Sequence, residues 1–271
     1  MIGAIAGDII GSVYEYAFYK GKIFNPKPYQ NFELFQEKSR FTDDTTMSIA
    51  VAEAILTNTS YKARLHEYGN AYWGVGYGGR FKGWLQTALE EAKPYDSFGN
   101  GSGMRVSAVG WAYNSIEDVL EAAKETALPT HNHPEGIKGA QAIALAVYLA
   151  RIGESKKTIK NEIQKRMGYD LERTTAAIRP NYHFDVTCQG SIPESILCFL
   201  ESKDLEDAIR LAISLGGDTD TMAAMSGAIA QAFYKEVPQE IYDGVKARLD
   251  ESLWQVLVRF EKQFQITYTF I

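Results

Sequence analysis

The chain has 271 residues, of which 45% are hydrophobic and 23% are charged, and its formal net charge is −6. This composition is typical of a folded protein that buries a sizeable core, so it excludes an intrinsically disordered chain and favours one domain spanning residues 1–271. The negative charge argues against bulk nucleic-acid binding, because a protein that holds a polyanion needs a broad basic face.

Cys188 and Cys198 are the two cysteines, and their spacing suggests neither a disulfide framework nor a zinc site. The first eight residues lack the basic region of a signal peptide, and the apolar stretch at residues 140–150 is too short to span a bilayer. We therefore expect a cytoplasmic protein with no membrane contact. No apolar stripe stands out as unpartnered, which favours a monomer.

Apolar residues recur at helical spacing along most of the chain, and alternating strand-like runs are scarce. In chain order, this spacing predicts helices near residues 47–55, 136–151, 155–167, 193–201, 205–213, 221–234 and 239–264, the last of them with an interruption. The sequence therefore predicts an all-α fold.

The ends of several helices carry their own signals. Ser115 opens a capping-box-like tetrad, and Asp204 precedes the apolar run that starts at Leu205. Glycines mark expected helix ends at Gly153, Gly168 and Gly216. The Gly- and Asn-rich stretch 96–103 and the stretch 129–134 interrupt the helical pattern, so both are expected to be loops that carry ligand contacts.

Near the N-terminus, Asp8, Gly11 and Glu15 follow one another at helical spacing, so one helix face presents two carboxylates beside a small residue. One interpretation is a close-packed helix whose glycines admit a neighbour. If a metal site lies nearby, Glu15 becomes the natural carboxylate for acid or base work on a water or a leaving group.

The segment 41–47 places Thr42, Asp43 and Asp44 directly before a helix rich in small residues. Taken alone, this pattern is explained by an ordinary N-terminal cap, because a threonine or aspartate there bonds free backbone N–H groups and acidic residues suit the positive end of the helix dipole.

The segment 215–222 repeats this arrangement with Asp218, Asp220 and Thr221. If the two helix starts face one another, four carboxylates meet, and their repulsion is costly unless cations neutralise it. Carboxylate and hydroxyl oxygens without paired cysteine or histidine select a hard cation, Mg²⁺ or Mn²⁺ in its place. We favour two such ions, about 3.5–4 Å apart, over a pair of unrelated helix caps.

The stretch 99–105 resembles a phosphate-binding loop in composition, because glycines expose successive backbone N–H groups to an anion, although a plain turn also explains it. His131 and His133 lack a matching partner pair for zinc, so hydrogen bonding to substrate and a structural role both stay open. An aromatic stripe also has two interpretations, since its side chains belong either to the core or to a substrate subsite. It consists of Tyr72, Trp73, Tyr77, Phe81 and Trp84.

In their order along the chain, these segments resemble the ADP-ribosylglycohydrolase family. The resemblance rests on residues 7–15, 41–45, 99–105, 130–133 and 216–221 and covers nearly the whole chain. It implies a compact all-α fold with two Mg²⁺ ions at the bottom of a cleft. The metal ligands that it implies are Thr42, Asp43, Asp44, Asp218, Asp220 and Thr221.

The same resemblance implies that Glu15 is the catalytic glutamate, acting as a base or as an acid. It also implies that His131 and the loop residues Asn100, Gly101, Ser102, Gly103 and Met104 contact the ribose and diphosphate. The expected activity is hydrolysis at ribose C1″ of ADP-ribose on proteins, with the arginine linkage favoured. Serine-linked ADP-ribose, poly(ADP-ribose) and O-acetyl-ADP-ribose are alternative substrates, and a non-catalytic ADP-ribose-binding protein is the alternative of another class.

Overall fold

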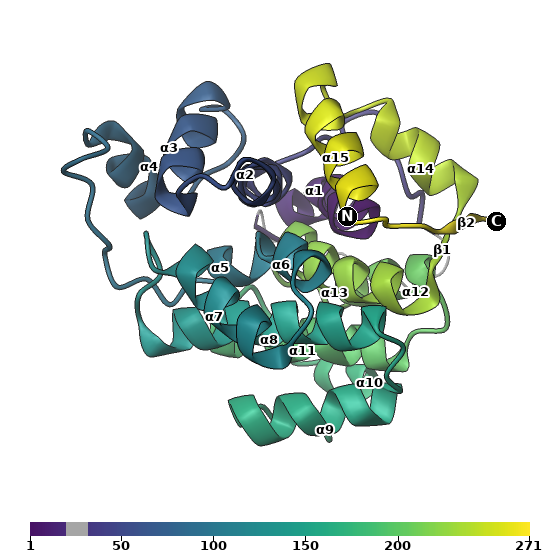
Figure 1. Ribbon diagram of the computed structural model, residues 1–271. Helices are drawn as coiled ribbons and strands as arrows, with labels where there is room; N and C mark the ends of the chain where they lie inside the picture. The colour runs from purple at the N-terminus through teal and green to yellow at the C-terminus, as the bar shows by residue number, and fades with distance from the viewer. Residues whose placement is uncertain (20–31) are drawn as a thin grey trace.

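The computed structural model describes residues 1–19 and 32–271, and these residues form an almost entirely helical fold (Figure 1). The all-α prediction is therefore confirmed. The helices of the first half are α1 (Ile2–Tyr19), α2 (Asp43–Thr57), α3 (Tyr61–Ala71), α4 (Gly79–Gln86), α5 (Gly101–Met104), α6 (Ser107–Ala112), α7 (Ile116–Ala127) and α8 (Pro134–Arg151).

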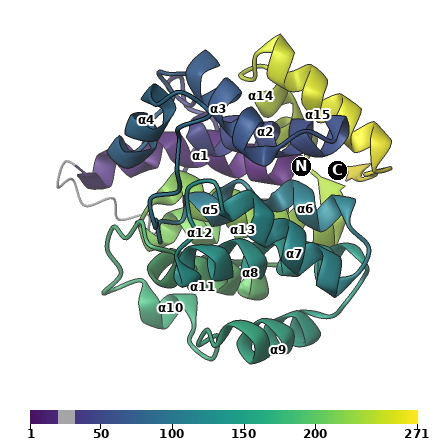
Figure 2. The ribbon, with the colours of Figure 1, turned by 60° about the vertical axis from the view of Figure 1, so that its left-hand side comes forward.

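The second half continues with α9 (Lys156–Met167), α10 (Thr175–Ile178), α11 (Cys188–Glu201), α12 (Leu205–Leu215), α13 (Thr219–Tyr234), α14 (Gln239–Lys246) and α15 (Glu251–Gln263). Two short parallel strands, β1 (Glu236–Val237) and β2 (Thr269–Phe270), pair beside α14. In both ribbon views α9 lies at one end of the molecule, and α3, α4, α14 and α15 lie at the opposite end (Figures 1 and 2).

The predicted helix ends are confirmed where a cap marks them. Ser115 accepts a hydrogen bond from Asp118 N at the start of α7, and Asp204 accepts one from Asp207 N at the start of α12. Gly168 and Gly216 end their helices in the left-handed conformation, which glycine adopts without strain. Local hydrogen-bonding chemistry was therefore enough to place these ends.

The predicted start at residue 193 is wrong, because α11 begins five residues earlier, at Cys188. Thr187 caps the helix by accepting a hydrogen bond from Gly190 N, and Pro193 lies inside the helix. Proline favours the first turn because it lacks an N–H donor there, so it misled the prediction. The interruption expected in 239–264 is confirmed, since Asp250 caps a separate helix, α15.

Helix α1 is buried along its first three turns and packs against α13 with little space between the two backbones. A Cβ atom added to Gly7 would lie 2.1 Å from Ala223 O, and one added to Gly11 would lie 2.5 Å from Asp220 Cα. Thr219 Oγ1 also donates a hydrogen bond to Gly11 O. The glycines therefore admit a neighbour, and this close contact carries Asp8 and Glu15 to the start of α13.

Replacing Gly7 by alanine should lower the free energy of unfolding by about 1–3 kcal/mol or more, because backbone atoms of α13 leave no room for the methyl group. Chemical denaturation measures this change. The matched control is Gly83→Ala in α4, where nothing lies within 4 Å of the added atom. That variant should gain stability, since alanine favours a helix interior over glycine. Equal effects of the two substitutions would contradict the proposed close packing.

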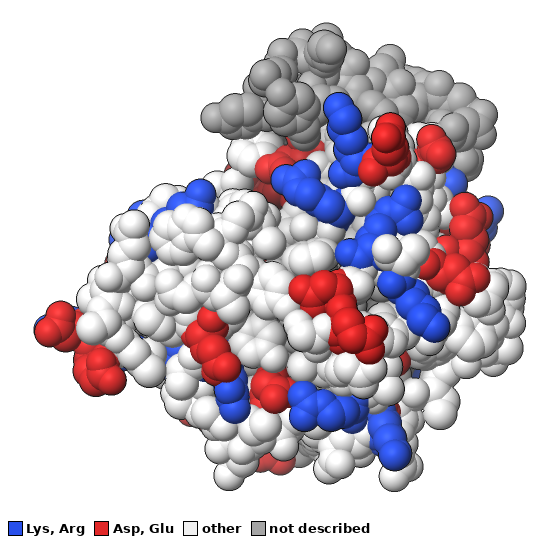
Figure 3. All heavy atoms as spheres, turned by 90° about the horizontal axis from the view of Figure 1, so that it is seen from above, with Lys and Arg blue, Asp and Glu red and all other residues white. Residues whose placement is uncertain are grey.

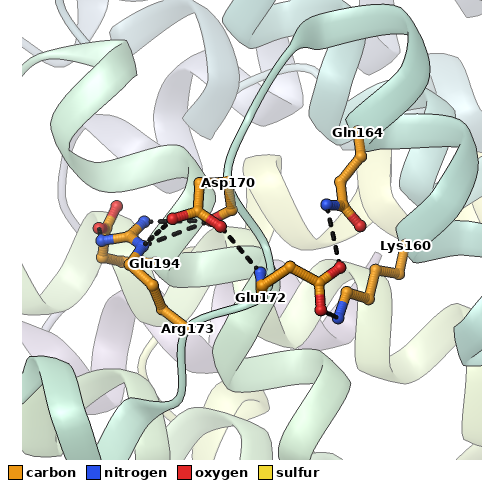
Figure 4. Close-up of polar contacts among 6 residues, drawn as sticks. All are labelled: Lys160, Gln164, Asp170, Glu172, Arg173 and Glu194. Carbon is orange, nitrogen blue, oxygen red and sulfur yellow. Dashed lines mark hydrogen bonds and ion pairs between the residues drawn. The ribbon is translucent and has the colours of Figure 1, made fainter.

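A polar network fastens α9 and the segment that follows it to α11 (Figure 4). Lys160 pairs with Glu172 at 2.8 Å, and Gln164 donates a second hydrogen bond to the same carboxylate. Arg173 pairs with the buried Glu194 of α11 at 2.7 Å. The exposed pair of Lys160 and Glu172 adds little stability, whereas Arg173 compensates the buried charge of Glu194.

Charged side chains of both signs lie among one another on the face that carries α14 and α15 (Figure 3). No helix within residues 1–19 and 32–271 combines the length and apolar character that crossing a membrane requires.

Candidate functional site

A cavity of about 460 Å³ lies beside the starts of α2 and α13. Its walls also include the loop 75–81, the segment 95–105 with α5, and residues Phe184 and Val186 before α11. Gly99 and Thr187 form an isolated antiparallel bridge, so two of these wall segments are held to each other. The cavity therefore collects residues from opposite ends of the chain.

Carboxylates gather at this cavity in two overlapping groups, of which Asp44, Asp218, Asp220 and Glu15 line it. In the first group, oxygen atoms of Asp8, Asp44 and Asp220 all lie within 4.8 Å of one another. In the second group, the same holds for Glu15, Asp218 and Asp220. Because Asp220 belongs to both, the two groups form one continuous acidic centre.

The starts of α2 and α13 face each other, as expected from their shared sequence pattern. Thr221 Oγ1, at the start of α13, donates a hydrogen bond of 3.1 Å to Asp44 Oδ2 in α2. Thr42 caps α2 by accepting from Asp44 N, and its hydroxyl also contacts Asp8 Oδ1 at 2.7 Å. Asp218 occupies the cap position of α13 but makes no side-chain cap bond. The second segment is therefore not an ordinary helix cap.

Asp8 is fully buried, and sequence reasoning did not place it among the ligands. Its carboxylate accepts hydrogen bonds from Thr42 N at 2.9 Å, Thr45 N at 3.1 Å and Thr45 Oγ1 at 2.5 Å. These bonds tie α1 to the first turn of α2. The available signal was the helical spacing of Asp8 and Glu15, which places both carboxylates on the face of α1 that meets the acidic centre.

The electrostatics of the centre call for cations. Burial, followed by the charge of Asp220, raises the pKa of Asp8 and of Glu15 to about 7 and that of Asp43 to about 8. The same causes raise the pKa values of Asp44 and Asp218 well above the usual range. These shifts measure how strongly the centre resists holding several negative charges at once.

The donor atoms also fit a hard cation. Asp44 Oδ1 is buried and has no hydrogen-bond partner within the described residues. A buried carboxylate oxygen left without a partner is costly, and a cation would satisfy it. Every side chain of the two groups offers oxygen, the donor that Mg²⁺ and Mn²⁺ prefer. The centre therefore fits the cations expected from sequence.

These pKa shifts predict how metal-free protein responds to pH. Carboxyl groups whose pKa rises on folding stabilise the folded state while protonated, and that contribution is lost as pH rises through the folded values of about 7 to 8. Bound Mg²⁺ favours the ionised carboxylates. If Mg²⁺ binds this centre, the increase in melting temperature that it causes should therefore grow between about pH 5 and about pH 9. A thermal shift that is the same at every pH would contradict this prediction.

Four of the six predicted substrate-binding residues line the cavity: Asn100, Gly101, Met104 and His131. The Asn100 side chain also donates a 2.7 Å hydrogen bond to Asp218 Oδ2. Asn100 therefore holds one of the clustered carboxylates, a role that its loop did not reveal.

Ser102 and Gly103 do not line the cavity as expected. Ser102 is fully buried, and its hydroxyl donates to Gly136 O at 2.7 Å, on the side of α8. Gly103 packs so tightly against Ile192 that an added Cβ would lie 2.8 Å from its side chain. The loop turns into the short helix α5 at Gly101, and this turn directs the two residues into the protein.

A family model described as ADP-ribosylglycohydrolase matches residues 1–267. The chain belongs to the ADP-ribosylglycohydrolase family. Among similar proteins, ADP-ribosylhydrolase ARH3 of Bos taurus is 27% identical, over 88% of this chain and 85% of its own length. ADP-ribosylhydrolase ARH3 of Homo sapiens is also 27% identical, over 88% of this chain and 86% of its own.

A solved structure titled ADP-ribosylglycohydrolase-related protein complex has the same fold, with a TM-score of 0.63 and 22% sequence identity. The match covers 98% of this chain and 94% of that one. Family membership makes the chain a hydrolase of glycosidic bonds to ADP-ribose.

In this ADP-ribosylglycohydrolase, the residues of the aromatic stripe have different surroundings, and Trp73 is 40% exposed. Tyr77 and Phe81 line the cavity, whereas Tyr72, Trp73 and Trp84 are not among the described residues of its wall. Tyr72 bonds Ser252, and Trp84 stacks on Phe81 behind the wall. The proposed role of Trp73 in a substrate subsite is therefore not supported.

The two histidines of the segment 129–134 also have different positions. His133 caps α8, because its Nδ1 accepts a hydrogen bond from Glu135 N, so its role is structural. His131 is buried in the cavity wall.

Several cavity residues escaped sequence reasoning, among them Arg40 and Arg80. Both line the cavity together with Arg105, the last residue of the stretch 99–105. Against the rise that burial causes, the charge of Arg40 lowers the pKa of Glu15, and burial, followed by the charges of Arg105 and Arg80, lowers the pKa of His131. Arg80 stacks on Tyr95, with its guanidinium carbon 4.9 Å from the ring centroid. Arg40 and Arg80 stand in no motif of their own, so only the fold reveals that they share the cavity with Arg105.

Proposed function

We propose that this protein is a Mg²⁺-dependent hydrolase that removes ADP-ribose from modified protein side chains by cleaving the bond at ribose C1″. The observation that carries the proposal is the pair of carboxylate groups joined by Asp220 at the cavity. Two Mg²⁺ ions, or Mn²⁺ in their place, suit such a set of oxygen donors. Their ligands in this proposal are Thr42, Asp43, Asp44, Asp218, Asp220 and Thr221.

Asp8 supports this set from α1. It holds Thr42 and Thr45 through four hydrogen bonds and shares the first carboxylate group, so it either fixes the ligands or joins them. Asn100 orients Asp218 through its side-chain hydrogen bond. Bound Mg²⁺ supplies positive charge that orients the ribose hydroxyls.

Glu15 is the proton-transfer group of the proposal. It is half-buried, lines the cavity, and has an oxygen within 4.8 Å of both Asp218 and Asp220. In the hydrolysis, the oxygen of water bonds to C1″ while the bond from C1″ to the acceptor breaks, and the acceptor atom gains a proton. A carboxyl group at this position either takes the proton of the water or supplies that of the acceptor.

The acceptor that we propose is arginine. Five carboxylates line the cavity: Glu15, Asp43, Asp44, Asp218 and Asp220. The negative charge that the bound Mg²⁺ ions leave uncompensated, on Glu15 above all, favours a cationic guanidinium near the site of cleavage. Arg40 also lines the cavity, where its charge acts on Glu15 and opposes such a cation. Because these charges act in opposite directions, the acceptor is decided by comparing release of ADP-ribose from the arginine linkage with release from the serine linkage.

The experiment follows release of ADP-ribose from parallel arginine-linked and serine-linked substrates, with Mg²⁺ and with EDTA. Release that requires Mg²⁺ and is lost in Asp218→Ala supports the metal-dependent hydrolase, and faster release from the arginine-linked substrate supports the linkage. Faster release from the serine-linked substrate would overturn the linkage alone. Tight ADP-ribose binding without release from either substrate would instead favour a non-catalytic binding protein.

A further inference from the structure

A chain of hydrogen bonds leads from a buried arginine to the histidine in the cavity wall. Arg105 is 1% exposed, and its Nη2 donates to Thr130 Oγ1 at 2.9 Å and to Thr126 O at 2.7 Å. Thr130 Oγ1 in turn lies 2.7 Å from His131 Nδ1. Three side chains are thus linked in series, and the last of them faces the cavity.

The direction of these bonds follows from the donors available. A guanidinium group has only donors, so Thr130 Oγ1 accepts the bond from Arg105. Thr130 is fully buried, and a buried hydroxyl hydrogen without an acceptor is costly. Within the described residues, His131 Nδ1 is the remaining partner of this hydroxyl. Thr130 therefore donates to Nδ1.

A ring nitrogen that accepts a hydrogen bond carries no hydrogen, so the hydrogen of a neutral His131 ring lies on Nε2. The ring is neutral because burial, followed by the charges of Arg105 and Arg80, lowers the pKa of His131 well below its usual range. The backbone also fixes this arrangement, since Thr130 N and His131 N both donate to Ala127 O at the end of α7.

The Nε2 atom lies at the wall formed by the loop 99–101. A Cβ added to Gly101 would approach Nε2 to 3.1 Å, and one added to Gly99 would approach it to 3.7 Å. Within residues 1–19 and 32–271, Nε2 has no hydrogen-bond partner. A donor is thus available at the cavity, and the glycines beside it keep it uncovered.

We propose that Thr130 and Arg105 are positioning residues, which hold His131 as the tautomer with its hydrogen on Nε2 and so present a donor to an oxygen atom of the ligand. The ligand is ADP-ribose, so this inference rests on the proposed function, and a ribose hydroxyl or a phosphate oxygen is the matching acceptor. Arg105 sets the position of the hydrogen through Thr130, and its charge also helps to keep the ring neutral. Because the guanidinium donates to Thr130 Oγ1, the hydroxyl hydrogen of Thr130 is directed to the imidazole.

The tautomer is tested first in ligand-free protein, so that this result does not depend on the proposed function. The chain has four histidines, and nitrogen NMR of ¹⁵N-histidine-labelled protein distinguishes a protonated ring nitrogen from an unprotonated one. The signals of His131 are identified by their loss in His131→Gln.

We expect hydrogen on Nε2 in the wild type and in Thr130→Ser. We expect a mixture of tautomers in Thr130→Val, which keeps the shape and lacks the hydroxyl. Hydrogen on Nδ1 in the wild type, or an unchanged tautomer in Thr130→Val, would overturn the inference.

The second measurement is the dissociation constant for ADP-ribose. Thr130→Val should weaken binding by about 10-fold, the effect of one well-placed hydrogen bond, and Thr130→Ser should restore it. In a His131→Ala background, adding Thr130→Val should cause no further loss, because Thr130 acts through the ring. Additive losses, or equal losses in the serine and valine variants, would contradict the relay. Wild-type protein that does not bind ADP-ribose would count against the proposed function, while the tautomer result would still decide the relay.

Discussion

Replacing Asp220 by asparagine should lower the rate of ADP-ribose release by at least about 100-fold and weaken Mg²⁺ binding. Asp220 is the carboxylate that belongs to both acidic groups, so its loss removes a donor from each. Asparagine keeps the size of the side chain and one oxygen, which separates the effect of charge from that of packing. Release assays measure the rate, and calorimetric titration with Mg²⁺ measures the affinity.

The matched control for Asp220→Asn is Asp204→Asn. Asp204 caps α12 and lies outside the acidic centre, and asparagine caps a helix as well as aspartate does. The control should keep both activity and Mg²⁺ affinity. If Asp220→Asn binds Mg²⁺ as tightly as the wild type, the shared-ligand arrangement is wrong, whatever its activity.

Glu15→Gln should reduce turnover by about 100- to 10,000-fold, the usual contribution of a proton-transfer group, while Mg²⁺ and ADP-ribose still bind. Glutamine retains an oxygen near Asp218 and Asp220 but neither takes up nor releases a proton at neutral pH. Single-turnover kinetics, together with titrations of both ligands, separate the chemical step from binding.

Glu37→Gln is the companion variant for Glu15→Gln. Glu37 is exposed, follows α1 in the chain and is not among the described residues that line the cavity. It should behave as the wild type. Near-normal turnover in Glu15→Gln would remove Glu15 from the mechanism, and loss of Mg²⁺ binding in that variant would make it a ligand instead.

The parts of the fold that sequence predicted are those with local causes. Caps at Ser115 and Asp204 and the glycine at position 216 each act within one turn of helix, so the chain itself marks those ends. The prediction of the start of α11 failed because proline generally prefers the first turn of a helix, whereas Pro193 lies inside this one. The similar segments at the starts of α2 and α13 predicted the acidic centre. Carboxylates that meet repel one another whatever fold connects them, so the need for a cation could be inferred from the two segments alone.

The parts of the site that escaped prediction depend on distant contacts. Asn100 bonds Asp218 across 118 positions of the sequence, and nothing in its glycine-rich loop points to that partner. Ser102, in the same loop, was expected to contact substrate, because composition does not tell which side chains turn inward at α5. Arg105 and Thr130 meet only after the end of α7 is placed beside α5. Burial and long-range geometry, rather than residue type, decide these roles.

The division of the acidic centre between α1 and α13 has a consequence for assembly of the chain. Gly11 and Thr219 are bonded across 208 positions of sequence, and Asp8 and Asp220 meet through the same contact. If the polypeptide is cut in a surface loop between α2 and α13 and expressed as two pieces, neither piece carries the complete set of carboxylates. Tight Mg²⁺ binding would then return only when the pieces reassociate. If the acidic centre holds Mg²⁺ as proposed, metal binding reports fragment complementation, and Mg²⁺, by binding only the joined form, would drive that reassociation by mass action.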